Sequence, residues 1–377
     1  MNGNIRFGSI FGIPFYLNPS WFIVLALVTL DYGYEVSEIT HLPGLVPWTW
    51  GLIIALLLFG SVLVHELGHS LVAISQGIKV KSITLFLFGG LAILEKESKR
   101  PLESLLVAIA GPLVSLLFFV ILTLINDNLQ LPLVLRLVVQ VLASINLVLG
   151  LFNLIPGLPL DGGNILKAIV WKITGNPNKG ILIASRFGQA FGYVAIVIGV
   201  LSVFKLIQYG SIWTILIGFF LLQNAKLAAQ SVQVKENLEG FTALDVMIDR
   251  GPIASDNLNL REFANNYVIG QKPWKRFLLK DAAGKLSGIL TVESLKNVPT
   301  SLWSQTLVSQ IQEEPENLVT VLSSTPLLEV ISSLEQQINS AELIVLSQTD
   351  ELLGLIDRIS IAEFLQKRAL TLVSPNT

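Results

Sequence analysis

Six long apolar runs occupy the first 234 residues and alternate with short polar or glycine-rich segments. They cover residues 21–30, extending toward 34, and residues 48–74, 102–125, 132–151, 187–204 and 212–225. About 20 consecutive apolar residues are enough to cross a bilayer as a helix. The pattern therefore predicts a polytopic α-helical membrane protein with about six transmembrane helices.

Two shorter segments have the alternation of β-strands. Residues 5–17 alternate apolar residues with Gly and Pro, which predicts a short strand pair at the membrane surface. After Gly77, apolar residues at alternate positions flank Phe88, Gly89 and Gly90, which predicts a membrane-associated β-hairpin. Its unpaired outer edge would let an extended peptide bind by strand addition, with Leu85 and Leu87 as candidate residues on that edge. A purely structural re-entrant hairpin is the alternative.

The chain repeats itself after Glu239. Residues 276–291 match residues 342–357 at an offset of 66, and each copy reads strand, turn, strand, helix. This predicts a two-unit α/β module in residues 235–377, following a membrane domain in residues 1–234.

Composition supports this division. The chain is 52% hydrophobic and 14% charged, with a mean hydropathy of +0.66, too apolar for an ordinary soluble protein. Residues 1–234 carry 13 basic and 9 acidic residues, and residues 235–377 carry 12 and 18, which sum to the 25 and 27 of the whole chain. The sequence has no basic strip that would indicate nucleic-acid binding.

Basic residues gather in the loops on one side of the predicted membrane domain. Lys79, Lys81, Lys96, Lys99 and Arg100 all lie between the second and third spans. By the positive-inside rule, we expect the N-terminus, the adjacent end of the second helix and the C-terminal module to be cytoplasmic.

The second apolar run contains an H-E-x-x-H motif, from His65 through Glu66 to His69. On a helix the two histidines share one face, where they can bind zinc while Glu66 acts as general base. A chance match is the alternative. An ionisable residue deep in a membrane helix costs from about 2.5 kcal/mol, however, and usually has a function. The motif therefore predicts the active-site helix of a zinc metalloprotease.

The fourth apolar run ends in residues 153–163, where two prolines and three glycines interrupt the helix. Irregular backbone at membrane depth must be buried in protein or line a wet cavity, so we expect this break to face the active site. Because the chain has no cysteine, Asp161 is the candidate third ligand of one zinc per chain. Its alternative role is N-cap of the following helix, expected over residues 164–172. His41 is a poor candidate for the third ligand, because it lies before the second span.

These motifs together resemble the site-2 protease family of intramembrane zinc metalloproteases, in its bacterial and plastid-type branch. The resemblance covers residues 1–230 and includes the Phe88–Gly90 turn, Ala110-Gly111-Pro112 within the third run, and Asn153 through Gly162. Ala110-Gly111-Pro112 also permits a close helix contact or a kink. The resemblance implies His65, His69 and Asp161 as ligands, Glu66 as base, and Asn153 as a polar group that holds substrate or stabilises the oxyanion. One departure is Asn18, where relatives often have His.

The family implies cleavage of a substrate inside the bilayer, usually after another protease has trimmed it. The expected partner is a membrane protein with a single transmembrane segment, such as an anti-sigma factor or a membrane-tethered regulator. The expected location is the cell membrane, or a thylakoid or plastid membrane, with the active site near the cytoplasmic side.

Residues 240–365 resemble a tandem cystathionine-β-synthase-type (CBS) pair, a module that often binds adenine nucleotides and regulates an attached domain. Nucleotide-binding copies follow Gly-x-x-Thr with an Asp three residues after the Thr. Ser294 and Ser360 occupy the two equivalent positions here, so nucleotide binding is not expected. A structural or protein-docking role is the alternative to regulation.

The whole chain is thus expected to be a polytopic α-helical membrane protein followed by a cytoplasmic α/β tandem CBS-type module. Two other hypotheses remain: a CBS-regulated membrane transporter or channel, and a catalytically inactive membrane scaffold. A transport path does not need the residue spacing of the H-E-x-x-H motif, whereas a protease of this class cannot work without it.

Overall fold

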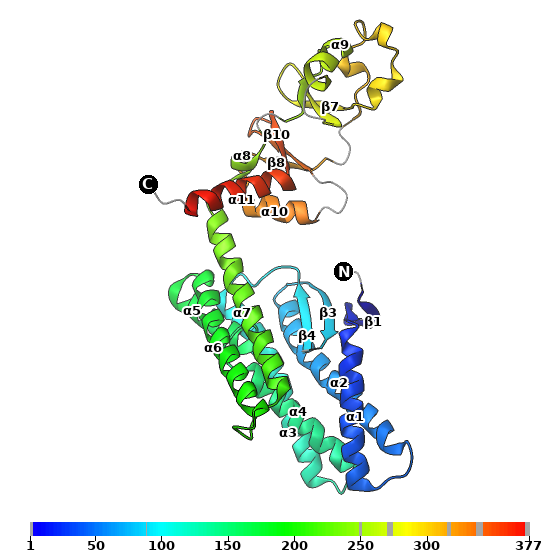
Figure 1. Cartoon of the computed structure of the whole chain (residues 1–377), viewed down its shortest axis with the longest axis vertical. Coiled ribbons are helices and arrows are strands. Elements are labelled where there is room, and N and C mark those ends of the chain that lie inside the picture. The colour runs from blue at the N-terminus through cyan, green and yellow to red at the C-terminus, as the bar shows by residue number, and fades with distance from the viewer. Residues whose placement is uncertain are drawn as a thin grey trace. The chain divides into compact units, whose positions relative to one another are not determined.

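Long helices dominate the first of two compact units, Met1–Gln233 and Val234–Thr377, into which the chain divides. The computed structural model describes residues 3–87, 89–248, 251–269, 274–314, 318–336 and 342–373 (Figure 1). The long helices that begin in the first unit are α1 Ser20–Thr40, α2 Val46–Ser75, α3 Pro101–Asn128, α4 Leu133–Asn153, α5 Asp161–Thr174, α6 Pro177–Val203 and α7 Ile212–Leu238, of which α7 ends in the second unit.

All six predicted long helices are present. In the described part of the chain, five of them (α2, α3, α4, α6 and α7) are long and apolar enough to cross a membrane. Helix α1 has 21 residues, about 31 Å at 1.5 Å per residue, but Asp31, Glu35 and Glu38 lower its hydropathy. It packs along α2, where Gly51 lies against Thr29 and Gly33 so closely that a side chain at position 51 would not fit.

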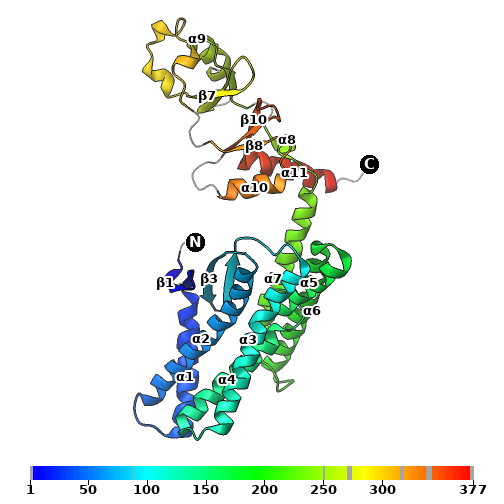
Figure 2. The ribbon, with the colours of Figure 1, turned by 180° about the vertical axis from the view of Figure 1, so that it is seen from behind.

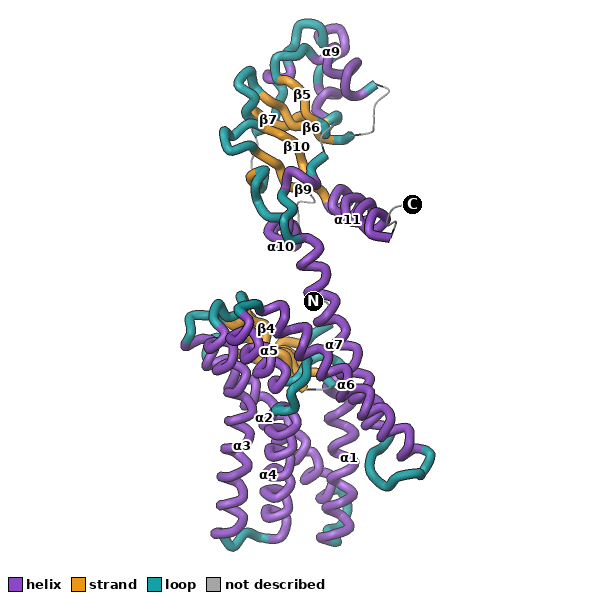
Figure 3. Tube along the Cα trace, turned by 90° about the vertical axis from the view of Figure 1, so that its left-hand side faces the viewer, coloured by secondary structure: helices purple, strands orange, loops and turns teal. Residues whose placement is uncertain are grey.

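One four-stranded sheet lies at the end of this helical unit where α5 is also found (Figures 2 and 3). Its strands are β1 Ile5–Ile10, β2 Ile13–Leu17, β3 Val80–Phe86 and β4 Gly89–Leu94, in the order β1-β2-β3-β4. The predicted strand pair and hairpin are both confirmed, although Phe88 of the hairpin turn lies outside the described residues.

The hairpin is not isolated, because β2 pairs with β3 in parallel, and of the two hairpin strands β4 alone forms an edge of the described sheet. Leu85, which the sequence suggested as an edge residue, is therefore inside the sheet. Its carbonyl accepts a hydrogen bond from the Asn18 amide, and the Leu87 amide donates to Ser20 Oγ. Residues 5–17 occupy that side of the hairpin, which the alternation within 80–93 alone could not indicate.

The second unit confirms the internal repeat. One sheet has the order β5-β6-β7 and the other β10-β9-β8. Their strands are β5 Ile253–Ser255, β6 Arg276–Lys280, β7 Leu286–Thr291, β8 Thr320–Leu322, β9 Glu342–Leu346 and β10 Leu352–Asp357. Strands β6 and β7 correspond to β9 and β10 at the predicted offset of 66. The short helices are α8 Ala243–Val246, α9 Leu260–Phe263 and α10 Leu327–Gln336, with a π-turn at Ala264–Val268.

The two copies differ after their second strand. The second copy continues into α11, Arg358–Val373, as expected. The first has only 3-10 turns, at Ser294–Asn297 and Thr300–Leu302, followed by another at Val308–Gln310. Pro299 lies between the first two turns and lacks the N–H that a continuous helix would need.

Apolar side chains from both copies share one core: Leu278 and Ile289 of the first copy with Ile344, Leu352 and Leu355 of the second. The equivalent first residues of β6 and β9, Arg276 and Glu342, form an ion pair of 2.7 Å. The repeat is thus packed as a pair rather than as two independent modules.

Both serines at the expected nucleotide positions are already hydrogen-bonded. Ser360 Oγ donates to the Asp357 carbonyl at 3.0 Å. Ser294 Oγ lies 2.5 Å from Thr291 Oγ1 and donates to a Glu313 carboxylate oxygen at 3.1 Å. Glu313 thus brings to the first copy a carboxylate that the local spacing did not reveal.

We predict that the full-length protein does not bind AMP or ATP at micromolar concentration. A neutral hydroxyl cannot replace a carboxylate that accepts two ribose hydroxyls, and the loss of about 1.5–3 kcal/mol lowers affinity by roughly tenfold to a hundredfold. Calorimetry in detergent measures this. Micromolar binding would contradict the prediction, and its disappearance in Glu313→Gln would identify Glu313 as the replacement carboxylate.

Candidate active site

Helix α2 places the two histidines of the motif one turn apart, and α3 fixes the outer nitrogen of each ring. His69 Nδ1 donates to the Val107 carbonyl at 2.6 Å, and His65 Nδ1 lies 2.9 Å from Ser115 Oγ. With each Nδ1 engaged, the two Nε2 atoms remain for a ligand on the opposite side.

Glycines allow α2 and α3 to approach closely enough for these contacts. A Cβ atom at Gly68 would come within 3.1 Å of the Ala110 carbonyl oxygen, and one at Gly111 would overlap the His69 ring. The close helix contact predicted at residues 110–112 is thus confirmed, with Pro112 inside an unbroken α3.

The break after α4 positions Asp161. Residues 154–160 fold back on α6, where the Leu158 amide donates to the Ala184 carbonyl at 3.1 Å. Gly157 packs against Gly188, leaving no room for a side chain at either position. Helix α5 begins at Asp161 rather than at residue 164, and its N-cap residue is Leu160. The N-cap alternative for Asp161 is therefore wrong.

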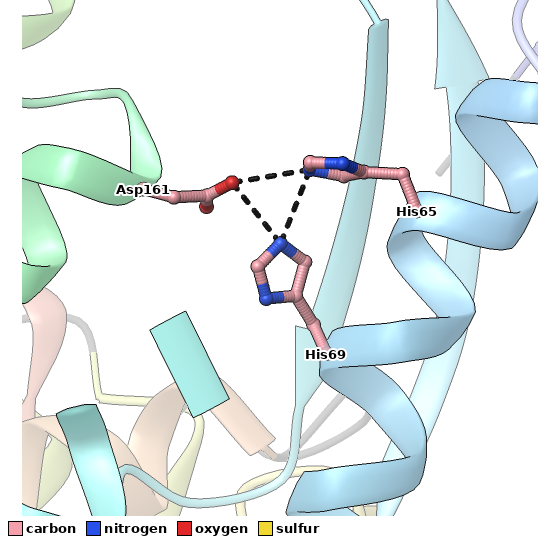
Figure 4. Close-up of side chains that lie close together, drawn as sticks. All are labelled: His65, His69 and Asp161. Carbon is pink, nitrogen blue, oxygen red and sulfur yellow. Dashed lines mark hydrogen bonds and ion pairs between the residues drawn. The ribbon is translucent and has the colours of Figure 1, made fainter. Parts of the chain in front are cut away.

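His65, His69 and Asp161 point their polar atoms at one another (Figure 4). Asp161 Oδ2 lies 3.1 Å from each Nε2, and the two Nε2 atoms lie 3.3 Å apart. Donors bound to one zinc at about 2.0–2.1 Å in tetrahedral geometry lie about 3.3–3.4 Å apart. The three side chains are only 3%, 12% and 18% exposed, so this donor set fits a zinc ion.

Glu66 stands outside this triangle and faces the free edge of β4. The backbone N–H of Ala92 points at its carboxylate, and the Glu66 side chain fills the space where Gly90 would carry a Cβ. Glu66, His69 and Asp161 together line a cavity of about 340 Å³. The carboxylate is thus near the donor set without being part of it, as a general base requires.

Asn153 is not brought into this cluster. It is the last residue of α4, its Nδ2 donates to the Leu149 carbonyl at 3.0 Å, and it lines a second cavity, of about 740 Å³. His41 caps the far end of α1, away from the motif, as the sequence suggested.

Sequence reasoning missed the residues that support the site. Ser115 is one of three hydroxyl-bearing residues in the apolar helix α3, and Val107 acts through its backbone, so neither gives a sequence signal. Gly90 and Gly111 were noticed as turn and packing residues, but their roles as space for Glu66 and His69 depend on tertiary structure.

Comparison with known proteins decides the family. The family described as Peptidase family M50 matches residues 53–132 and 130–198. "Putative zinc metalloprotease sll0528" of Synechocystis sp. is 56% identical over 369 residues, which cover 98% of this chain and 97% of that protein. The chain belongs to peptidase family M50.

Zinc metalloprotease MJ0392 of Methanocaldococcus jannaschii is 28% identical, and the matched region covers 89% of this chain and 98% of that protein. A solved site-2 protease from the same organism is 32% identical, and the match covers 60% of this chain and 95% of that structure's chain, with a TM-score of 0.45. The CBS domain of a bacterial CNNM/CorC family Mg²⁺ transporter is 14% identical over 36% of this chain and 80% of its own, with a TM-score of 0.28.

The family match and the Synechocystis relative confirm the predicted resemblance to zinc metalloproteases of the site-2 protease type. With its membrane-capable helices, this M50 peptidase is a multi-pass membrane protein. Family membership also favours the peptidase hypothesis over the transporter hypothesis.

The geometry predicts that Ser115→Ala weakens zinc binding. Loss of a hydrogen bond to the outer nitrogen of a ligating histidine typically lowers metal affinity by about 10- to 100-fold. Chelator competition on the purified protein measures this. Ser70→Ala is the matched control, because Ser70 is a buried α2 serine whose Oγ has no hydrogen-bond partner among the described residues. Equal zinc retention in both variants would show that Ser115 does not position His65.

Proposed function

We propose that this M50 peptidase hydrolyses peptide bonds within the transmembrane segments of membrane proteins. His65, His69 and Asp161 hold one zinc per chain, and Glu66 is the general base. The observation that carries the proposal is the donor triangle, with 3.1–3.3 Å edges, beside a carboxylate that is not part of it.

The chain's own residues handle the proton. Zinc, when bound, supplies the Lewis acidity for attack on the scissile carbonyl. The Glu66 carboxylate accepts a proton from the attacking water and returns it to the nitrogen of the leaving amine. Helix α2 holds Glu66 between the ligating histidines, so base and metal site are fixed by the same backbone. Asn153, at the end of the larger cavity, offers an amide to the substrate backbone.

The larger cavity supplies a route for an apolar segment. Its walls come from α1, α2, α4 and α7, and it also reaches Gly89 of β4 and Leu160, the residue before Asp161. An apolar groove that ends beside the metal ligands suits a transmembrane helix whose end must be unwound for cleavage. Such a groove would be of no use to a soluble peptide substrate.

The free edge of β4 can hold that unwound end. Leu85 points its carbonyl toward β2, so Thr84 and Phe86 face β4 and pair with Leu91 and Gly89. Backbone directions alternate along a strand, which leaves the N–H groups of Gly90, Ala92 and Leu94 on the outer edge. An extended peptide paired there would pass beside Glu66.

Basic loops support a cytoplasmic location for the active-site end and for the C-terminal module. A single-pass anti-sigma factor or another membrane-tethered regulator fits this arrangement as substrate, in a cell or thylakoid membrane. The two copies of the repeat pack as one pair. We assign this C-terminal module a regulatory role, in which a partner that binds to it changes the activity of the membrane unit.

Purified wild-type protein is expected to contain about one zinc per chain, and Glu66→Gln is expected to keep the metal and lose cleavage. Glutamine preserves the shape of Glu66 but cannot accept the proton. Elemental analysis gives zinc content, and co-expression with candidate single-pass anti-sigma factors gives cleavage. Cleavage by Glu66→Gln at the wild-type rate would remove Glu66 as the base.

Asp161→Ala is the companion variant, because it removes a proposed ligand rather than the base. It should lower zinc retention, whereas Glu66→Gln should not. Unchanged zinc content in Asp161→Ala would show that the triangle is not the metal site.

Leu94→Pro should slow cleavage while zinc content stays intact, because proline removes an outward N–H from the β4 edge. Leu94→Ala is the control, since it also shortens the side chain but keeps that N–H. The measurement is the fragment yield from a common substrate. Equal yields from the two variants would contradict peptide capture at this edge.

A further inference from the structure

The larger cavity is apolar except at two places along its wall. Leu27, Leu58, Phe59, Phe152 and Ile217 are representative of its lining, and Asn153 stands at its inner end. Asp31 of α1 is the one charged side chain among the described lining residues. It is exposed and makes no hydrogen bond or ion pair with any described residue.

Asp31 lies well inside the helix rather than at its end. It is 11 residues from Ser20, or about 16 Å along a helix of about 31 Å. Ionisable residues on helices that pack among membrane spans usually face a path or cavity and pair with an opposite charge. The exposed Asp31 carboxylate, in the wall of an apolar groove and without a partner among the described residues, is therefore available to a basic group that enters the groove.

Helix packing fixes the height of Asp31 relative to the metal ligands. Gly51 of α2 lies against Thr29 and Gly33, so Asp31 is level with Gly51. His65 is 14 residues further along α2, which is about 21 Å. That span corresponds to about 14 residues of helical substrate or about 6 residues of extended substrate.

We propose that Asp31 selects substrates that carry a lysine or arginine in the half of the transmembrane segment remote from the cleaved bond. This rests on the proposed function and narrows its substrate class. Opposite charges meeting in an apolar groove attract strongly, whereas an acidic residue at the same place is repelled. The apolar wall of the larger cavity binds any transmembrane helix. Asp31 favours those helices that place a basic residue beside it while the bond to be cleaved lies at the metal ligands.

The test uses the full-length protein in membranes with a set of designed single-pass substrates. These share one 20-residue apolar segment, about the length of a bilayer span, and carry Lys, Leu or Glu at one position that is moved along its outer half. We expect wild type to cleave the best Lys version about tenfold faster than its Glu counterpart, with Leu between them. Asp31→Lys should reverse the order, and zinc content should not change.

Glu35→Lys is the matched control, because Glu35 is an exposed acid on the same helix that is not among the described residues lining the cavity. It should keep the wild-type order of Lys, Leu and Glu. The same order in wild type and in Asp31→Lys would overturn the proposal.

A binding measurement separates this proposal from the proposed function. The chain has no cysteine, so Leu27→Cys in a Glu66→Gln background provides a single thiol one turn from Asp31. Disulfide yield with a cysteine placed in the substrate segment should follow the order Lys, Leu, Glu without any turnover. That order without wild-type cleavage would sink the protease function and keep Asp31 as selector. Yields independent of the charge, or no cross-link with any segment, would overturn the selector role.

Discussion

The convergence of His65, His69 and Asp161 on one point constrains the rest of the membrane unit. Two donors come from α2 and the third from the start of α5, 92 residues after His69. Their atoms can lie 3.1–3.3 Å apart only because glycines remove side chains where backbones must meet. Gly111 makes space for the His69 ring, and Gly157 and Gly188 let the chain after α4 fold onto α6. The requirement that these three side chains meet therefore constrains how α2 packs on α3 and how the chain after α4 packs on α6.

Glu66 lines one of two cavities that adjoin the β4 edge. One cavity is apolar and extends along α1, α2, α4 and α7, and the other holds Glu66, His69 and Asp161 with the β4 edge. A transmembrane segment and water have opposite solvation needs, so a protease in a bilayer must admit them by different paths. The β4 edge borders both cavities through Gly89 and Gly90, and an extended substrate lying along it would present its backbone to Glu66.

Local sequence signals predicted the long helices, from the apolar runs, and the paired strands of the second unit, from the 66-residue offset. The H-E-x-x-H motif and Asp161 singled out three side chains that the structure brings together. What failed depended on distant pairing: β2 beside β3 placed Leu85 inside the sheet, and Glu313 reached Ser294 from outside the repeat unit. The helix expected after the second strand of the first copy does not form, because Pro299 interrupts it. Comparing the two repeats did not take this proline into account. The position of Asn153 relative to Glu66 also required tertiary structure.

Polar groups buried in an apolar bundle need partners, and the inward face of α2 shows how this is achieved. Ser61, His65 and His69 recur every four residues on that face. Ser61 accepts from Asn146 Nδ2 at 2.9 Å, His65 meets Ser115, and His69 donates to Val107. Each contact ties α2 to α3 or α4, so the helix that carries the histidines cannot rotate without leaving buried polar groups unpaired. Asp31, on the neighbouring helix, is exposed and has no such partner among the described residues. Because its carboxylate satisfies no buried group of the bundle, it is available to a basic group that arrives with the substrate, as we propose.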